Sequence, residues 1–138
     1  MKYLKKFNES IEDDVFNDIF KHIEDLCLEF GDLGLDYKVR PTTKAPDWTI
    51  QDFGKNSDLP YTILIEITDT SYGFQIDRKI FNSIVKSIKD YVESQECNFA
   101  ISRYDEHDHY YLNDSGYTTF DDYLKDQGNF YGFEIRVF

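Results

Sequence analysis

Apolar residues recur at helical spacing between residues 10 and 30. These apolar residues are separated by one, three or four positions, which places them on one stripe of a helix. They are Ile11, Val15, Phe16, Ile19, Phe20, Ile23, Leu26, Cys27 and Phe30. Ser10 is a favourable N-cap, and Gly31 and Gly34 supply stop signals after the last apolar position. These features predict an amphipathic helix over residues 10–30.

The same spacing predicts a second helix over residues 77–93, with Asp77 as its N-cap. Its apolar stripe consists of Ile80, Phe81, Ile84, Val85, Ile88, Tyr91 and Val92. A short third helix is predicted over residues 119–125, where Thr119 is the N-cap and two acids occupy the first turn.

Alternating apolar and polar positions predict strands elsewhere. The clearest is residues 61–68, where one face is formed by Tyr61, Ile63, Ile65 and Ile67. Further strands are predicted over residues 37–40, 48–53, 97–104 and 130–138, with a weaker pattern at 110–112. We therefore expect an α+β fold, in which two main helices pack on one face of an antiparallel sheet of about five strands.

Residues 10–138 are expected to form a single domain, because no repeat or low-complexity segment divides them. Residues 1–9 are expected to lie outside this domain, as a basic leader. The longest connector spans roughly residues 105–128, and long structured connectors often carry function.

The charge of the chain is concentrated in two blocks. The 138 residues include 27 acids against 15 lysines and arginines, a formal net charge of −12. Residues 1–36 and residues 105–128 each contribute −6, whereas residues 37–104 balance. This charge disfavours nucleic acid and anionic lipid as partners, and no apolar run approaches the ~18 residues of a membrane span. The blocks are either solvated faces or a surface for a basic protein partner.

Motifs for catalysis are sparse. His107 and His109 lie on one side of an extended segment with carboxylates beside them, a ligand set that suits zinc, manganese or iron. No third ligand follows at a family spacing, and no nucleophile elbow or phosphate-binding loop occurs. Cys27 and Cys97 lie in apolar patterns that are typical of small core residues in a reducing cytoplasm. We expect no cofactor and no enzymatic activity.

Acids and tyrosines gather in the connector. Tyrosine is enriched in protein interfaces, and carboxylates complement a basic surface. The residues predicted to bind a protein partner are Asp105, Glu106, His107, Asp108, Tyr110, Tyr111, Asp121, Asp122 and Tyr123. His107 and His109 remain the candidates for the alternative, a metal-dependent enzyme.

The first nine residues resemble the capsid-targeting leaders of internal head proteins of large tailed phages. The matching residues are Met1, Lys2, Phe7 and Glu9, with cleavage expected between Glu9 and Ser10. The resemblance implies a protein that is packaged in the virion, injected into the host cytoplasm and active early. Proteins with such leaders include inhibitors of host defence enzymes, so the implied partner is a basic host enzyme.

The order of elements also resembles that of type III secretion chaperones, which are small acidic α+β dimers. Those proteins usually end in a helix, whereas this chain is predicted to end in a strand. The leading hypothesis is therefore a phage protein that acts by protein binding, as a host-takeover or anti-defence inhibitor, and a chaperone-like binding module is the alternative.

Overall fold

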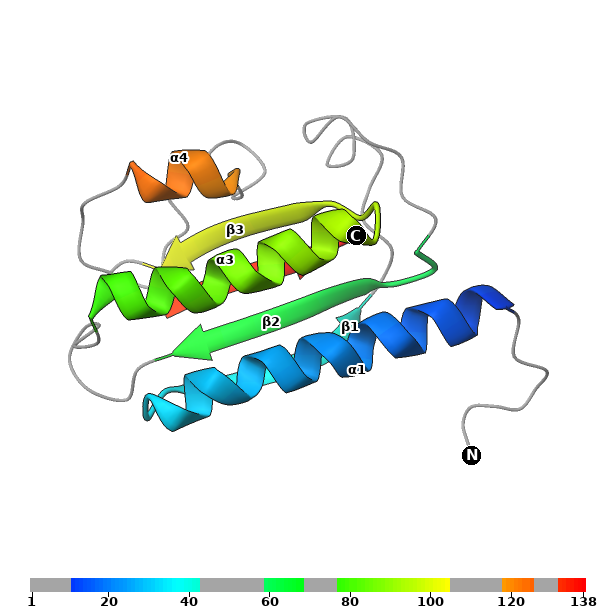
Figure 1. The fold of residues 1–138 in the computed structure, drawn as a ribbon, viewed down its shortest axis with the longest axis horizontal. Helices are drawn as coiled ribbons and strands as arrows, with labels where there is room; N and C mark the ends of the chain where they lie inside the picture. Colours follow the sequence, from blue (N-terminus) through cyan, green and yellow to red (C-terminus); the bar gives the residue numbers. More distant parts are fainter. Residues whose placement is uncertain (1–10, 43–58, 69–76, 105–117, 126–131) are drawn as a thin grey trace.

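The structure is a computed structural model that describes residues 11–42, 59–68, 77–104, 118–125 and 132–138 (Figure 1). In chain order its elements are α1 (Ile11–Asp32), β1 (Asp36–Thr42), β2 (Thr62–Thr68), α3 (Arg78–Ser94), β3 (Phe99–Tyr104), α4 (Phe120–Leu124) and β4 (Gly132–Val137). The predicted α+β class is confirmed, and the four described strands are close to the expected five. The strands predicted at residues 48–53 and 110–112 lie outside the described residues.

The described strands form one antiparallel sheet in the order β1-β2-β4-β3. The last strand, β4, therefore lies between β2 and β3, which run parallel to each other on either side of it. Strand β4 is buried along almost its whole length, as expected for a strand with a neighbour on each side. Helix α3 connects β2 to β3 across the sheet (Figure 1).

Strand β1 extends further than the sequence indicated. The prediction ended at residue 40, before Pro41, but Pro41 pairs opposite Ile63 in the ladder between β1 and β2. Proline cannot donate a ladder hydrogen bond, and sheets tolerate it mainly on edge strands. Among the described strands β1 has a neighbour on one side only, which explains why the ladder continues through the proline.

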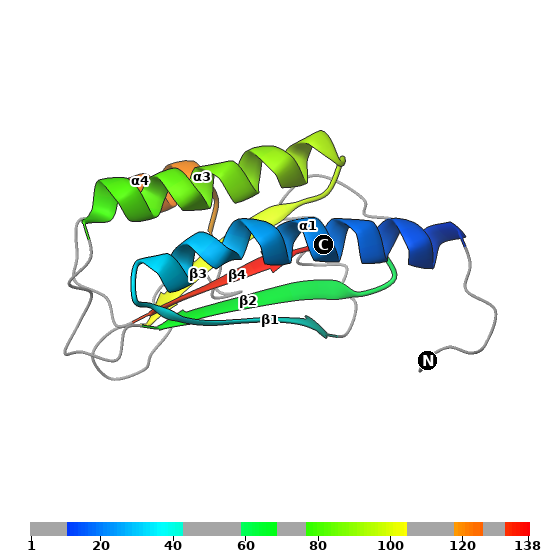
Figure 2. The ribbon, with the colours of Figure 1, turned by 60° about the horizontal axis from the view of Figure 1, so that its bottom comes forward.

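Helices α1, α3 and α4 all cover the same face of the sheet (Figure 2). The buried stripe of α1 consists of Phe16, Ile19, Ile23, Cys27 and Phe30, and that of α3 of Phe81, Ile84, Val85, Ile88 and Val92. These stripes pack on alternate strand residues, including Ile63, Ile65, Ile67, Ile101, Phe133 and Ile135, in one continuous core cluster. Each fully buried side chain of this size stabilises the fold by about 1.5–3 kcal/mol.

Three residues that the patterns assigned to buried faces are about half exposed: Val15 (48%), Tyr61 (48%) and Ile80 (49%). Val15 and Ile80 each precede a phenylalanine that is buried, Phe16 and Phe81, and consecutive helical residues point about 100° apart. Tyr61 precedes β2, and its ring contacts Phe16 edge-on with centroids 5.5 Å apart.

The predicted N-cap of α3 is confirmed, whereas α1 continues through Gly31, one of its two predicted stop signals, and ends at Asp32. Ser10, the predicted N-cap of α1, lies outside the described residues. The Asp77 carboxylate accepts a hydrogen bond from the Lys79 backbone N–H at 2.8 Å, which confirms it as the N-cap of α3. Gly34 follows α1 with a φ of 85°, a left-handed conformation that glycine adopts with little strain. No helix in the described part of the chain is long and apolar enough to cross a membrane.

Candidate functional site

The predicted partner-binding residues fall into two groups in the structure. Asp105, Glu106, His107, Asp108, Tyr110 and Tyr111 lie outside the described residues, as does His109. Asp121, Asp122 and Tyr123 belong to α4, the short helix beside α3. Helix α4 is therefore the described part of the predicted site.

Helix α4 is short but well anchored. Thr119 is its N-cap, as predicted, and its hydroxyl accepts a hydrogen bond from the Asp122 backbone N–H at 3.2 Å. Phe120 turns into the core and meets Phe99 of β3 edge-on, with ring centroids 6.2 Å apart. Asp121 and Asp122 are exposed in the first turn, where the helix dipole favours negative charge. Helix α4 thus exposes two carboxylates to solvent, while the Phe120 ring beside them packs into the core.

Tyr123 is buried, with only 3% of its surface exposed, whereas its two acidic neighbours are exposed. Its hydroxyl donates a hydrogen bond to the Asn82 side-chain oxygen and accepts one from Arg78 at 3.3 Å. Its ring packs edge-on against Phe133, with centroids 5.5 Å apart. Burial raises the pKa of Tyr123, and the nearby Arg78 opposes that shift. Tyr123 therefore holds α4 against α3 and is not available for direct contact with a partner.

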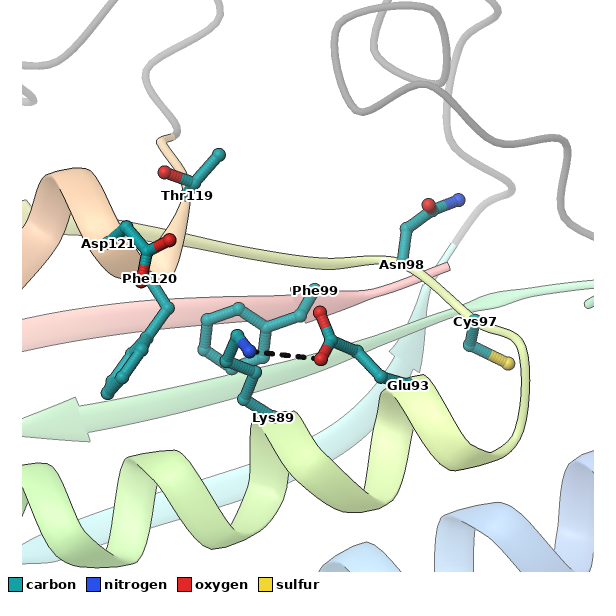
Figure 3. Close-up of a pocket in the computed structure, with 8 residues that line it drawn as sticks. All are labelled: Lys89, Glu93, Cys97, Asn98, Phe99, Thr119, Phe120 and Asp121. Carbon is teal, nitrogen blue, oxygen red and sulfur yellow. Dashed lines mark hydrogen bonds and ion pairs between the residues drawn. The ribbon is translucent and has the colours of Figure 1, made fainter.

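A cavity of about 220 Å³ lies where the second half of α3, the start of β3 and the start of α4 meet (Figure 3). It is lined by Lys89, Glu93, Cys97, Asn98, Phe99, Thr119, Phe120 and Asp121. Figure 3 shows Lys89 and Glu93 of α3 on one side and Phe120 and Asp121 of α4 on the other. The predicted site residue Asp121 therefore lines a cavity together with charged groups of α3 and an aromatic ring of β3.

Among the described residues that line this cavity, Lys89 is the only cation. Its ammonium group lies 2.9 Å from the Glu93 carboxylate and 5.8 Å from the centroid of the Phe120 ring. The hydrogen bond to Glu93 raises the pKa of Lys89, and the charges of Glu93, Asp90 and Asp121 act in the same direction. Lys89 therefore stays charged at neutral pH inside a setting of carboxylates and aromatic rings.

The largest concentration of acid in the described residues is on α1. This helix has eight acids and one base, Lys21, a net charge of −7. The structure describes the side-chain surroundings of six of these acids, and all six are exposed: Asp14, Asp18, Glu24, Asp25, Glu29 and Asp32. We call these six residues the α1 acidic face.

Two members of the α1 acidic face lie where a negative charge is unfavourable. Glu29 and Asp32 are in the last turn of α1, which contains no basic residue. The helix dipole places partial negative charge at this end and disfavours carboxylates there. Neither side chain makes a hydrogen bond or ion pair with another described residue. The stability of the helix does not explain these charges.

The opposite face of the sheet carries a row of polar residues that the sequence pattern did not single out. Glu134 of β4 lies directly between Glu66 of β2 and Ser102 of β3. Glu66 pairs with Arg40 at 2.9 Å, and Glu134 lies 3.7 Å from Arg136. The two arginines offset the repulsion between adjacent carboxylates, so this row is explained as a structural feature of the sheet.

The remaining chemical groups have structural explanations too. Both cysteines are free and buried, as predicted, and burial together with the charge of Glu24 raises the pKa of Cys27 to about 12. The His22 ring of α1 stacks on Tyr91 of α3 with centroids 3.9 Å apart. Within the described ranges no group of three or more His, Cys, Asp or Glu side chains is arranged to hold a metal ion.

The sequence indicated some of these features but not the cavity. Asp121 was identified from its charge, whereas Lys89 and Phe99 were assigned only to a helix and a strand. No periodicity in the sequence signals that these residues meet, because their contact depends on tertiary packing. Comparisons with protein-family models, with curated proteins and with solved structures find no match to this chain.

Proposed function

We propose that this protein acts by binding a second protein that presents a basic surface, and that the α1 acidic face is a main contact. The observation that carries the proposal is the position of Glu29 and Asp32, exposed carboxylates at the helix end that disfavours them. Departures from local stability rules are expected at functional sites. Asp121 and Asp122 form a second acidic patch on α4, a helix that lies on the same side of the sheet as α1 (Figure 2).

Charge of this kind is suited to partner recognition. A net charge of −7 on one helix attracts a basic surface over about one Debye length, roughly 10 Å at 0.1 M salt, and speeds association. The exposed Val15 and Leu28 provide apolar contacts on the same helix. The partner class is therefore a basic protein, in line with the basic host enzyme that the leader resemblance implies.

The resemblance of residues 1–9 to a phage leader widens the proposal to the setting of the interaction. In that setting the protein is carried in the virion and acts in the host cytoplasm on a defence enzyme. Mass spectrometry of purified virions tests this part by detecting the chain and by showing whether it begins at Ser10.

The binding proposal is tested with two charge-reversal variants that change the net charge equally. One carries Asp18→Lys and Asp25→Lys on α1, and the other carries Asp121→Lys and Asp122→Lys on α4. Partners captured by the wild type at low salt are identified, purified and titrated against all three proteins. We expect the α1 variant to lose at least about tenfold in affinity, since several close charge pairs are reversed. Unchanged affinity in both variants, with both folded, would refute the proposal.

A further inference from the structure

The cavity lined by α3, β3 and α4 has the composition of a site for a positively charged side chain. Phe99 and Phe120 form an aromatic wall, with ring centroids 6.2 Å apart at an interplanar angle of 83°. The charged residues are one ammonium, Lys89, against two carboxylates, Glu93 and Asp121. The described residues that line the cavity therefore have a net charge of −1, within an acidic chain. A cation is therefore the favoured occupant.

Lys89 already shows which contacts the cavity offers to a cation. Its ammonium group is 5.8 Å from the Phe120 centroid, within the range of a cation–π interaction, and donates a hydrogen bond to Glu93 at 2.9 Å. The Asp121 carboxylate, by contrast, makes no hydrogen bond with any residue that the structure describes. An acceptor therefore remains for a second cation.

We propose that this cavity binds an arginine side chain of the protein partner, an inference that rests on the proposed function. A guanidinium group is planar, stacks on an aromatic ring and donates paired hydrogen bonds to a carboxylate. The Phe120 ring and the Asp121 carboxylate supply those two contacts. A cavity of about 220 Å³ has room for several water molecules, and a guanidinium with its last methylene groups replaces them.

The entering guanidinium competes with Lys89 for Glu93. The side chain of Lys89 is 24% exposed and that of Glu93 is 48% exposed. Ion pairs with this exposure contribute little, so the flexible lysine is displaced towards solvent at low cost. Lys89 thus pairs with the Glu93 carboxylate in the free protein and moderates the affinity for arginine.

The test uses the isotopically labelled full-length chain and two small probes. N-acetyl-arginine amide carries the guanidinium, and N-acetyl-citrulline amide is its neutral isostere. We expect saturable NMR shifts of the backbone N–H groups of Asn98, Phe99 and Asp121 with the arginine probe and much smaller ones with citrulline. Equal shifts with both probes, or none with arginine, would overturn the inference.

Matched variants locate the binding in the cavity. Asp121→Asn is expected to weaken arginine binding about twofold to fivefold, whereas Asp122→Asn, which removes the neighbouring charge outside the cavity, leaves it unchanged. Lys89→Met is expected to strengthen binding by a similar factor, and Lys86→Met, on the same helix with its own partner Asp90, is the control. Equal effects within each pair would indicate general charge attraction and refute the cavity site.

The probe experiment is independent of the partner. Failure with arginine would remove the cavity site and leave the charge-reversal test on α1 untouched. If neither charge-reversal variant loses affinity for the partner, the proposed function is refuted, even where the probe binds.

Discussion

The charges in the last turn of α1 give a prediction about stability. Replacement of Glu29 by Gln and Asp32 by Asn removes both carboxylates with little change in side-chain size. Each is exposed, and neither has a hydrogen bond or ion pair with a described residue that the substitution would break. We therefore expect the double variant to be more stable than the wild type.

The size of the gain follows from two effects. A carboxylate in the last turn opposes the helix dipole by about 0.3–1 kcal/mol. Repulsion between Glu29 and Asp32, and between Asp25 and Glu29, adds about 0.2–0.5 kcal/mol for each pair. Because these positions are exposed and screened by salt, we expect a total near the lower limit, about 1 kcal/mol. For a chain of 138 residues this corresponds to a rise in Tm of about 3–4 °C.

The assay is urea unfolding followed by circular dichroism at roughly 20 mM and at about 0.5 M salt, where screening reduces the difference. The control variant, Asp14→Asn with Asp18→Asn, removes the same charge from the other half of α1. There the dipole favours the acid in the first turn, so its loss offsets the relief of repulsion between the two acids. A gain in the control equal to that in the last-turn variant would refute the dipole argument, and a loss of stability in the last-turn variant would refute the reasoning altogether.

Two further predictions concern buried groups. Tyr123→Phe removes the hydroxyl that forms hydrogen bonds with Asn82 and Arg78. We expect the free energy of unfolding, measured in urea, to fall by about 1–2 kcal/mol, because both polar groups lose a partner. An unchanged free energy of unfolding would show that these bonds do not hold α4. The Cys27 thiol, whose pKa is raised by burial from 9.0 to about 12, should resist thiol reagents at pH 8 in the native state. As the pH rises, the Cys27 thiol ionises in the unfolded chain before it does so in the native protein. The protonated thiol therefore contributes stability that is present below pH 9.0 and lost as the pH rises towards about 12. A Cys27→Ala variant whose stability falls equally over that range would contradict this prediction.

The sequence predicted those parts of the fold that depend on local periodicity and capping. The stripe of α1, the N-caps Asp77 and Thr119 and the class of the sheet follow from residues close together in the chain. The place of β4 between β2 and β3 does not, since strand order depends on contacts far apart in sequence. The alternation in residues 130–138 is equally compatible with an edge position.

The end of α3 shows another limit of pattern analysis. The chain leaves this helix through Glu96, which has a φ of 59°, a conformation more typical of glycine. No stop residue in the sequence marks this turn. The next residues, Cys97 and Asn98, line the cavity, so this turn, which the sequence does not signal, borders the candidate site.

The charge along the helix layer indicates how a partner is arranged on it. Helix α3 lies between α1 and α4 (Figure 1) and carries four bases against two acids, a net charge of +2. A basic partner is therefore attracted by α1 and by α4 but repelled between them. Its contacts are expected to be two separate patches, with its least basic residues over α3.

Two patches that do not share side chains should contribute independently to affinity. Free-energy effects of distant substitutions add within about 0.3–0.5 kcal/mol. If the partner contacts both helices, a variant that combines the α1 and α4 charge reversals should lose affinity by the product of the two separate factors. If the partner contacts α1 alone, the combined variant should match the α1 variant. A combined loss much smaller than either single loss would contradict both arrangements, because it would mean that the reversed charges restore an interaction elsewhere.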